Sequence, residues 1–187
     1  LYPEIDEFCK VNRTSIFKLI FCSLAVYMNR VTGQDDLVIT GVNHNRTQEN
    51  RRKVIGMFVS TIPFRVSING DMAFNLFLEQ TGKETINYIL KNHQQYPFDL
   101  LAAELREISG ADTGFLWDTV ISAHGDVEKE NFQFEHVYQG CQANAFAIHI
   151  NYNNKYIDGI VELEYEYQVE LFSRGEIQRI HQGLVNI

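Results

Sequence analysis

The run IFKLIFCSLAVYM, residues 16–28, is apolar on almost every side when it is drawn as a helix. Either Thr14 or Ser15 can cap its start, and the pattern ends before the Thr-Gly pair at 32–33. Thirteen residues that include a lysine are too short to span a bilayer. Because such a helix must bury most of its surface, we expect it to lie beneath other layers of structure.

The segments that follow mix strands with helices. Residues 159–167 alternate apolar side chains with Glu162, Glu164 and Glu166, which predicts a strand with one dry and one wet face. The order shows neither repeats nor strict strand–helix alternation, so we predict an α/β layered domain with a mixed sheet flanked by helices. The predicted strands are 36–42, 54–66, 115–122, 146–152 and 159–167, and the predicted helices start at Asp71, Pro97 and Ser173 after the first one.

The predicted strand at 54–66, VIGMFVSTIPFRV, is apolar at both ends and polar at its centre. It follows residues 43–53, which hold no hydrophobic side chain. An unpaired hydroxyl in a core costs about 2–7 kcal/mol, so Ser60 and Thr61 need polar surroundings. Pro63 removes a donor from the strand ladder, so we expect an edge strand or a bulge here.

Charge and cysteine content exclude several classes of function. A formal net charge of −8 argues against nucleic acid as a partner, although the basic residues between 46 and 53 could form a local patch. The three cysteines lack metal-ligand spacing, so we predict a reduced, cytoplasmic protein. No signal peptide is visible, and no membrane partner is expected. The chain starts at Leu1 without a methionine and stops within a helical pattern, so we expect a piece of a longer protein.

The spacing of the histidines reveals no catalytic or metal-binding motif. The sequence holds six histidines but no H-E-x-x-H, C-x-x-C, Walker, G-x-G-x-x-G or G-x-S-x-G motif, and no metal site is predicted. An H-x-x-x-D acyltransferase motif is also absent, the nearest case being His149 followed by Asn153. His149 would share a strand face with Ala147 and Asn151 and face the glutamates of the next strand. We interpret it as a half-buried histidine bonded to a carboxylate, with a catalytic base as the alternative. The glutamates themselves are interpreted as a solvated face rather than a glycosidase pair.

The stretch with the polar centre matches a family motif. Residues 55–61 read IGMFVST with Arg65 after them, which resembles [IV]-G-x-F-V-N-T followed by Arg, with Ser in place of Asn. Upstream, residues 27–46 contain T-G-x-x-D, a strand and then Asn45 and Arg46. Downstream, NHQQYPFDLL is similar to H-Q-D-x-P-F-E. In this order the motifs resemble the condensation domains of non-ribosomal peptide synthetases.

The similarity extends along most of the chain, from about residue 5 to residue 187. Residues 106–109 fit the start of the family's R-D-x-S-R-N-P-L motif, whereas the following GADTGFL does not. Later, GIVELEYEYQVELFS matches the strand and the "elF" that precede the closing helix.

The resemblance implies a fold and a reaction. Condensation domains have two lobes, each resembling chloramphenicol acetyltransferase, with a channel between them. The N-terminal lobe carries H-H-x-x-x-D-G, whose second histidine is linked to amide formation. That motif is absent here, so residues 1–187 are expected to be a single domain that forms the C-terminal lobe, inactive alone. The parent enzyme would join two acyl groups held as phosphopantetheine thioesters, and this chain would bind no cofactor directly.

The expected partners follow from the same resemblance. They are the N-terminal lobe, the aminoacyl and peptidyl carrier domains, and the adjacent adenylation domain. Two alternatives remain open: a lobe of an epimerisation domain, which shares the fold, and a catalytically inactive module that docks carrier domains.

The resemblance also suggests roles for individual residues. In the family, the loop before I-G-x-F-V forms the channel floor, which corresponds here to residues 43–56. Ser60 and Thr61 either line or brace the tunnel or bond backbone groups around Pro63, and for Arg65 a structural role is favoured. The residues expected to form the tunnel wall and the floor loop are Asn45, Arg46, Ser60, Thr61 and Arg65. The motif residues expected to be structural are Gly56, Phe58, His93, Pro97 and Phe98. No catalytic residue is expected in this chain.

Overall fold

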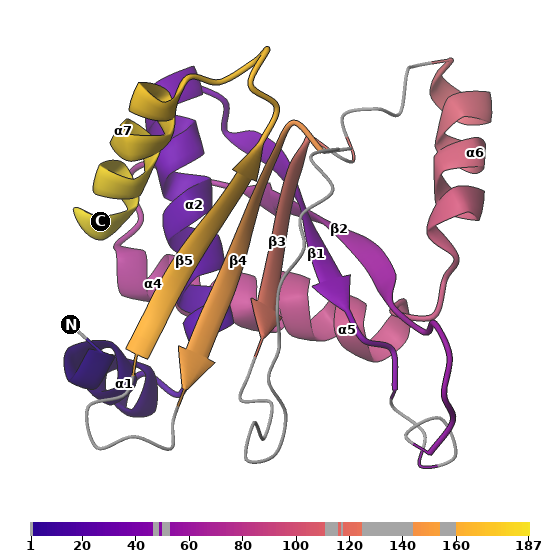
Figure 1. The fold of residues 1–187 in the computed structure, drawn as a ribbon, viewed down its shortest axis with the longest axis horizontal. Helices are drawn as coiled ribbons and strands as arrows, with labels where there is room; N and C mark the ends of the chain where they lie inside the picture. Colours follow the sequence, from indigo (N-terminus) through magenta and orange to yellow (C-terminus); the bar gives the residue numbers. More distant parts are fainter. Residues whose placement is uncertain are drawn as a thin grey trace.

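The structure is a computed structural model that describes residues 2–46, 49, 53–110, 116, 118–124, 144–153 and 160–187. The strands form a five-stranded sheet in the order β2-β1-β3-β4-β5, seen in Figure 1. The inner pairs β1–β3 and β3–β4 are parallel, and the outer pairs are antiparallel. The elements are α1 Tyr2–Val11, α2 Ile16–Thr32, β1 Asp36–Asn43, β2 Ser60–Ser67, α4 Phe74–Gln80, the π-helix η1 Thr81–Asn87, α5 Tyr88–Asn92, α6 Phe98–Ser109, β3 Thr119–His124, β4 Phe146–Asn153, β5 Ile160–Tyr167 and α7 Arg174–Val185.

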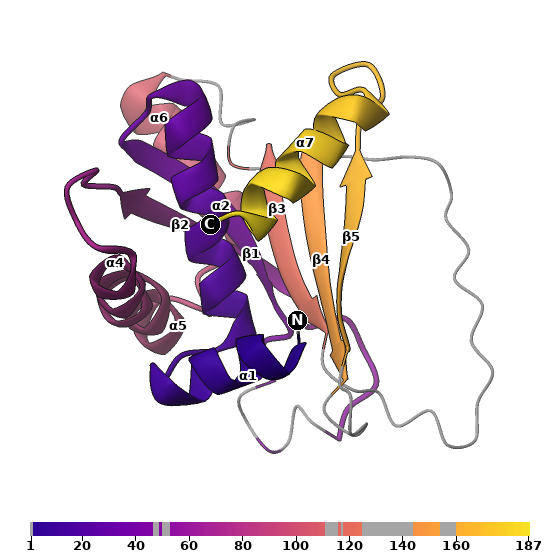
Figure 2. The ribbon, with the colours of Figure 1, turned by 90° about the vertical axis from the view of Figure 1, so that its left-hand side faces the viewer.

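Helix α2 is buried, as its sequence predicts. Ser15 caps its start, where Oγ accepts from the Lys18 N–H at 3.3 Å, and Gly33 ends it with φ +71°. It contacts β1, β3, α1, α4 and α7. The five residues 21–25 at its centre are buried. Figure 2 shows α2, α4 and α7 gathered on one side of the sheet.

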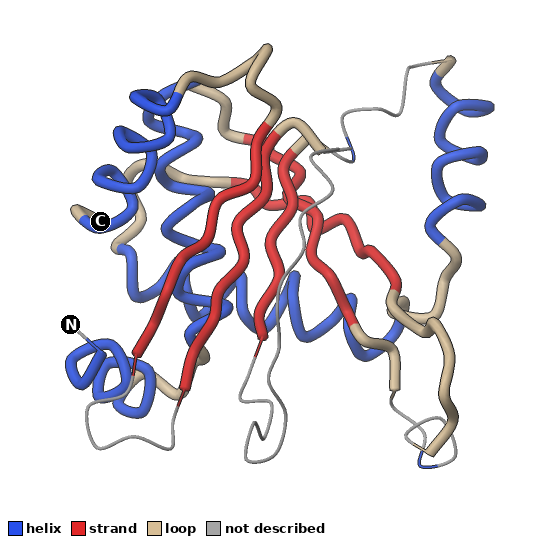
Figure 3. The backbone as a smooth tube through the Cα atoms, in the orientation of Figure 1, coloured by secondary structure: helices blue, strands red, loops and turns tan. Residues whose placement is uncertain are grey.

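The fold class is confirmed: a mixed sheet carries its helices in layers, as expected for a chloramphenicol-acetyltransferase-like fold. The core forms where α2 meets the sheet, with Phe21 and Phe64 packed edge to face at 5.7 Å between ring centroids. Ile148 and Ile150 of β4 complete it without solvent exposure. Figure 3 shows the strands side by side with helices around them.

Strand β2 starts later than predicted. It begins at Ser60 rather than at residue 54, because its partner β1 ends at Asn43, which lies opposite Ser60. Beyond that point Asn45 has φ +50°, which turns the chain away from the sheet. The register from Asp36–Ser67 to Asn43–Ser60 is uninterrupted, so β2 is an edge strand without a bulge. An edge position is the place where Pro63 is tolerated.

The helix predicted from Asp71 also differs. It begins at Phe74 with Ala73 at its N-cap, and Asp71 instead donates its N–H to Asn69 Oδ1 at 3.0 Å. Its middle turns form the π-helix η1, where Gly82 lies close to the Lys18 side chain. Helix α1 is not among the predicted elements, although it packs Phe8 and Cys9 against the core.

The last third of the chain follows the prediction closely. Strands β4 and β5 coincide with the predicted ones within one residue, and β5 turns its apolar side chains to the core. Ser173 and Glu176 form a reciprocal capping box at the start of α7. Strand β3 starts at Thr119, later than predicted. Four residues that belong to the sets named in the sequence lie outside the described residues: Arg51 and Arg52 of the basic segment, His136 and Cys141.

Candidate functional site

The motif segments, far apart in sequence, meet at one corner of the molecule. This corner joins the end of β1, the start of β2 and the connection between α5 and α6 (Figure 1). Asn43 Nδ2 donates to Gln94 Oε1 at 2.9 Å, which ties β1 to that connection. Thr61 of β2 and His93 line the same cavity. The three motifs singled out in the sequence therefore form one site.

Arg46 holds the segment before β2 in place. Its Nη1 donates to the Val54 carbonyl and its Nη2 to the Gly56 carbonyl, both at 2.8 Å. Its guanidinium lies over the Phe58 ring, 4.6 Å from the centroid. Arg46 therefore connects the Asn-Arg element with the I-G-x-F-V motif.

Asn45 forms the bend that brings Arg46 to this place. Its N–H donates to Asn43 Oδ1 at 3.2 Å, which supports the positive φ described above. Asn is one of the few residues other than Gly that adopt this conformation readily. Whether Asn45 and Arg46 also form a channel floor remains a prediction.

Ser60 and Thr61 occupy different surroundings. Ser60 Oγ is buried and has no hydrogen-bond partner among the residues that the structure describes. A buried hydroxyl without a protein partner is uncommon, and such a group often has a functional reason. Thr61 lines a cavity at the corner, next to Pro63.

Arg65 lies at the other end of β2 and bonds within the sheet surface. Its Nε donates to both Asp36 carboxylate oxygens at 2.9 and 3.1 Å, and its Nη2 donates to Asp36 at 2.5 Å. The hydrogen bonds from Arg65 lower the pKa of Asp36. This cross-strand pair supports the structural interpretation of Arg65.

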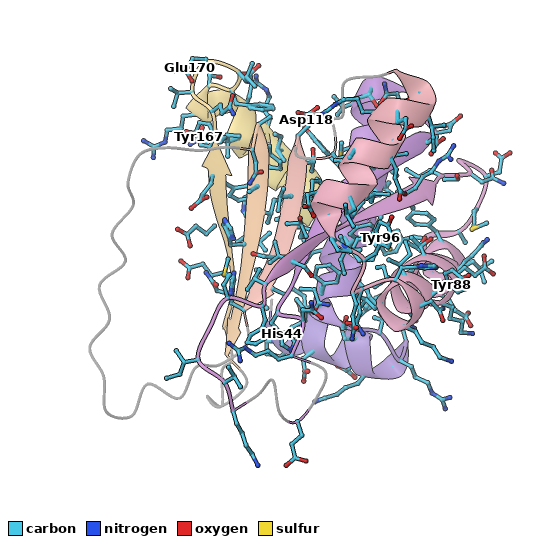
Figure 4. The ribbon with its side chains drawn as sticks, turned by 90° about the vertical axis from the view of Figure 1, so that its right-hand side faces the viewer. His44, Tyr88, Tyr96, Asp118, Tyr167 and Glu170 are labelled. Atoms are coloured by element: carbon cyan, nitrogen blue, oxygen red, sulfur yellow. The ribbon has the colours of Figure 1, made fainter. Side chains whose placement is uncertain are left out.

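The cavity has a volume of about 350 Å³ and lies between α5, α6 and β2. Helix α6 contributes no buried residue to the core. Tyr96 lies between α5 and α6 in Figure 4, and its hydroxyl donates to Glu104 Oε1 at 2.6 Å. The cavity is lined by Thr61, Ile62, Pro63, Ile89, His93, Tyr96, Phe98, Leu101 and Glu104.

The motif residues around this cavity have distinct places. His93 ends α5 and packs near the Tyr88 ring, 5.6 Å between centroids. Pro97 is the N-cap of α6 with φ −64°, and Phe98 begins the helix. Sequence reasoning missed Tyr96 and Glu104. The i, i+3 spacing of Phe98, Leu101 and Glu104 places Glu104 on one helix face with the other two, and this was the available signal for Glu104. Tyr96 precedes α6 and has no such signal.

His149 lies where its strand face predicted. The register places Ala147 opposite Glu166 and His149 opposite Glu164. Its Nδ1 is 2.7 Å from Ser122 Oγ, and its Nε2 is 3.4 Å from Glu166 Oε2. The second separation is an ion-pair distance but longer than a good hydrogen bond.

Ser122 joins two histidines. Its Oγ lies 2.7 Å from His149 Nδ1 and 2.9 Å from His124 Nε2, and a hydroxyl has one proton, so it can donate to only one of these two ring nitrogens. His149 Nε2 is buried and has no hydrogen-bond partner among the described residues. Because Ser122 is only 3% exposed, the network links β3, β4 and β5 internally. His149 is thus a half-buried histidine beside a carboxylate.

The segment before β2 exposes apolar side chains. Ile55 is 102% exposed and Met57 is 86% exposed, and Val54 and Val59 are also exposed. Large apolar side chains that gather on one exposed segment indicate a contact surface.

Two further classes of site were sought in the part of the chain that the structure describes. It contains no group of three or more His, Cys, Asp or Glu residues arranged to hold a metal ion. None of its helices combines the length and apolar character needed to cross a membrane.

Two curated proteins similar to this chain are synthases from Bacillus species. The chain is 31% identical over 190 residues to surfactin synthase subunit 1 of Bacillus subtilis (strain 168), covering all of this chain and 5% of that protein. It is 27% identical over 191 residues to bacitracin synthase 3 of Bacillus licheniformis, covering all of this chain and 3% of that protein. The chain therefore spans only a small part of these relatives.

Solved structures show the same fold. The condensation domain from Monacolin K polyketide synthase MokA matches with a TM-score of 0.79 and 16% identity, covering 97% of this chain and 42% of that one. The first condensation domain of the CDA synthetase matches with a TM-score of 0.73 and 16% identity, covering 95% and 39%. The sequence profile of the Condensation domain matches residues 2–187. This chain belongs to the Condensation domain family.

Proposed function

We propose that this chain is the C-terminal lobe of a two-lobed condensation domain that forms an amide bond between carrier-bound aminoacyl and peptidyl thioesters. The observation that carries the proposal is the meeting of the motif segments at one corner, where Asn43 bonds to Gln94 and where Thr61 and His93 line one cavity. The segment before β2 also exposes Ile55 and Met57. A channel between two lobes needs both features: a wall of positioned side chains and a surface that the other lobe covers.

Each group of residues has a role in this proposal. Thr61 lines the tunnel wall. Ser60 braces it from the neighbouring position, where its buried hydroxyl has no hydrogen-bond partner among the described residues. Asn45 and Arg46 shape the floor loop, and the structural motif residues Gly56, Phe58, His93, Pro97 and Phe98 support it. Arg65 braces the sheet at the other end of β2.

The reaction would be shared between the lobes. The N-terminal lobe supplies the histidine of H-H-x-x-x-D-G, and phosphopantetheine arms on carrier domains deliver donor and acceptor thioesters. An adenylation domain loads the carriers. The acceptor amine then attacks the donor carbonyl, a step that depends on positioning two tethered reactants and stabilising the oxyanion. This lobe contributes positioning and a docking surface, so the chain alone forms no amide.

The exposed segment before β2 provides the test. In a synthetase that contains this chain, we expect the double substitution Ile55→Asp and Met57→Asp to lower amide formation about tenfold or more, because the lobe contact positions the reactants. The melting temperature of the 187-residue chain should not change, since both side chains are exposed. The measurement is single-turnover amide formation with both carriers preloaded.

Ile108→Asp is the matched control, because Ile108 is 82% exposed but lies near the end of α6, away from this segment. It should leave amide formation unchanged. Equal turnover in the double variant and the control would contradict the proposal. Inversion of the donor α-carbon without amide formation would identify an epimerisation domain instead.

A further inference from the structure

The cavity beneath α6 combines apolar walls with one carboxylate. Ile62, Ile89, Phe98 and Leu101 contribute apolar surface, and Glu104 adds a charged group. Its volume of about 350 Å³ lies within the range of small-molecule sites, about 300–1,000 Å³. Such a cavity can select a ligand by shape and by one fixed charge.

A hydrogen bond holds the Glu104 carboxylate in place. The Tyr96 hydroxyl donates to its Oε1 at 2.6 Å, and this hydrogen bond raises the pKa of Tyr96. Among the residues that the structure describes, no Lys or Arg forms an ion pair with Glu104. The hydrogen-bond partner of the carboxylate is therefore the neutral Tyr96 hydroxyl rather than a cation.

The aromatic rings add a second preference for a cation. Tyr96 and Phe98 both line the cavity. Ammonium groups are attracted to aromatic faces by about 0.5–1 kcal/mol at exposed sites. An apolar stem with a cationic end matches these surroundings better than a neutral or anionic group of the same size.

We infer that this cavity binds a basic substrate side chain, an alkyl stem that ends in an ammonium group. The stem packs against Phe98 and Leu101, and the ammonium group pairs with Glu104. This inference rests on the proposed function, since it assigns a substrate class to the same corner. Thr61 lines the cavity as well, which connects the side-chain site with the proposed tunnel wall.

The test uses two probes of matched shape, pentylammonium and 1-pentanol, titrated into the 187-residue chain and followed by amide chemical shifts. We expect both to perturb residues 96–104, with pentylammonium binding roughly fivefold tighter, which corresponds to an exposed ion pair of about 1 kcal/mol. Glu104→Gln should remove that preference and leave 1-pentanol binding unchanged. Glu107→Gln, an exposed glutamate of the same helix outside the cavity, should behave as the unchanged protein.

Several outcomes would overturn the inference. Equal binding of the two probes, a preference that survives Glu104→Gln, or no perturbation of residues 96–104 would each do so. Perturbation of these residues by a separately expressed N-terminal lobe, with no effect of the probes, would identify the cavity as a lobe contact. Amide formation in the parent synthetase is measured separately, so failure here leaves the proposed function standing.

Discussion

Cys22 is an ionisable side chain in the core of the molecule. It is fully buried in α2, and burial raises the pKa of its thiol from 9.0 to about 12. Burial also raises the pKa of Tyr165 in β5 to about 12. Both groups therefore remain protonated in the folded state at pH values where the unfolded chain has begun to release its protons.

The pH dependence follows from that difference. A group with a raised pKa in the folded state contributes stability below its unfolded pKa, and this stability is lost as pH rises toward the folded value. We expect the free energy of unfolding to fall between about pH 9 and 12, with Cys22→Ala reducing the slope above pH 9. Urea unfolding at several pH values measures the free energy of unfolding and its slope against pH.

Cys9→Ala is the control for this prediction. The Cys9 pKa is also raised by burial, but to a smaller extent, so its removal should change the slope less. An unchanged slope in Cys22→Ala would show that the thiol does not titrate differently in the folded and unfolded states.

At the scale of elements, the close crossing of α2 and α7 depends on a glycine. A Cβ at Gly183 would lie 2.2 and 2.5 Å from two Tyr27 ring atoms. We expect Gly183→Ala to lower the free energy of unfolding by about 1–3 kcal/mol, because the helices would have to separate. Denaturant titration measures the change.

Gly175→Ala in the same helix is the matched control. A Cβ there meets its nearest atom at 3.8 Å, which is an ordinary contact. The helix propensity of Ala should make this variant as stable as the original or more stable, by up to about 1 kcal/mol. Equal effects of the two substitutions would show that the crossing does not require Gly183.

Elements with strong local signals were predictable from the sequence. Ser15 and Gly33 bound α2, the Ser173–Glu176 box starts α7, and alternation identifies β5. The strand prediction for residues 54–59 is wrong because their apolar character resembles a strand, whereas their structure depends on the Arg46 side chain and the end of β1. Such distant contacts leave no local pattern.

Asp71 shows a similar limit at the start of a helix. It is a good capping residue, but its N–H donates to Asn69 Oδ1, and the helix starts at Phe74 with Ala73 at its N-cap. Because Ala73 forms no side-chain cap, capping chemistry could not predict this start from the sequence.

At the scale of the whole molecule, the family motifs predicted which segments matter but not how they meet. Their convergence requires β2 to lie at the sheet edge and α6 to stand beside it (Figure 1). Neither follows from local pattern, because strand order is decided by packing between distant segments. The hydrogen bond between Tyr96 and Glu104 became visible only through that arrangement.

The central claim is that the corner around Thr61 is a wall of the substrate channel. In the parent synthetase, Thr61→Ala should lower single-turnover amide formation about tenfold with preloaded carriers, because a displaced reactant loses its attack geometry. The urea midpoint should stay the same. Ser67→Ala, at the other end of β2 and outside the cavity, should change neither quantity. A lower midpoint with normal amide formation in Thr61→Ala, a loss of about 1 kcal/mol, would contradict the claim and make Thr61 a structural residue of an edge strand.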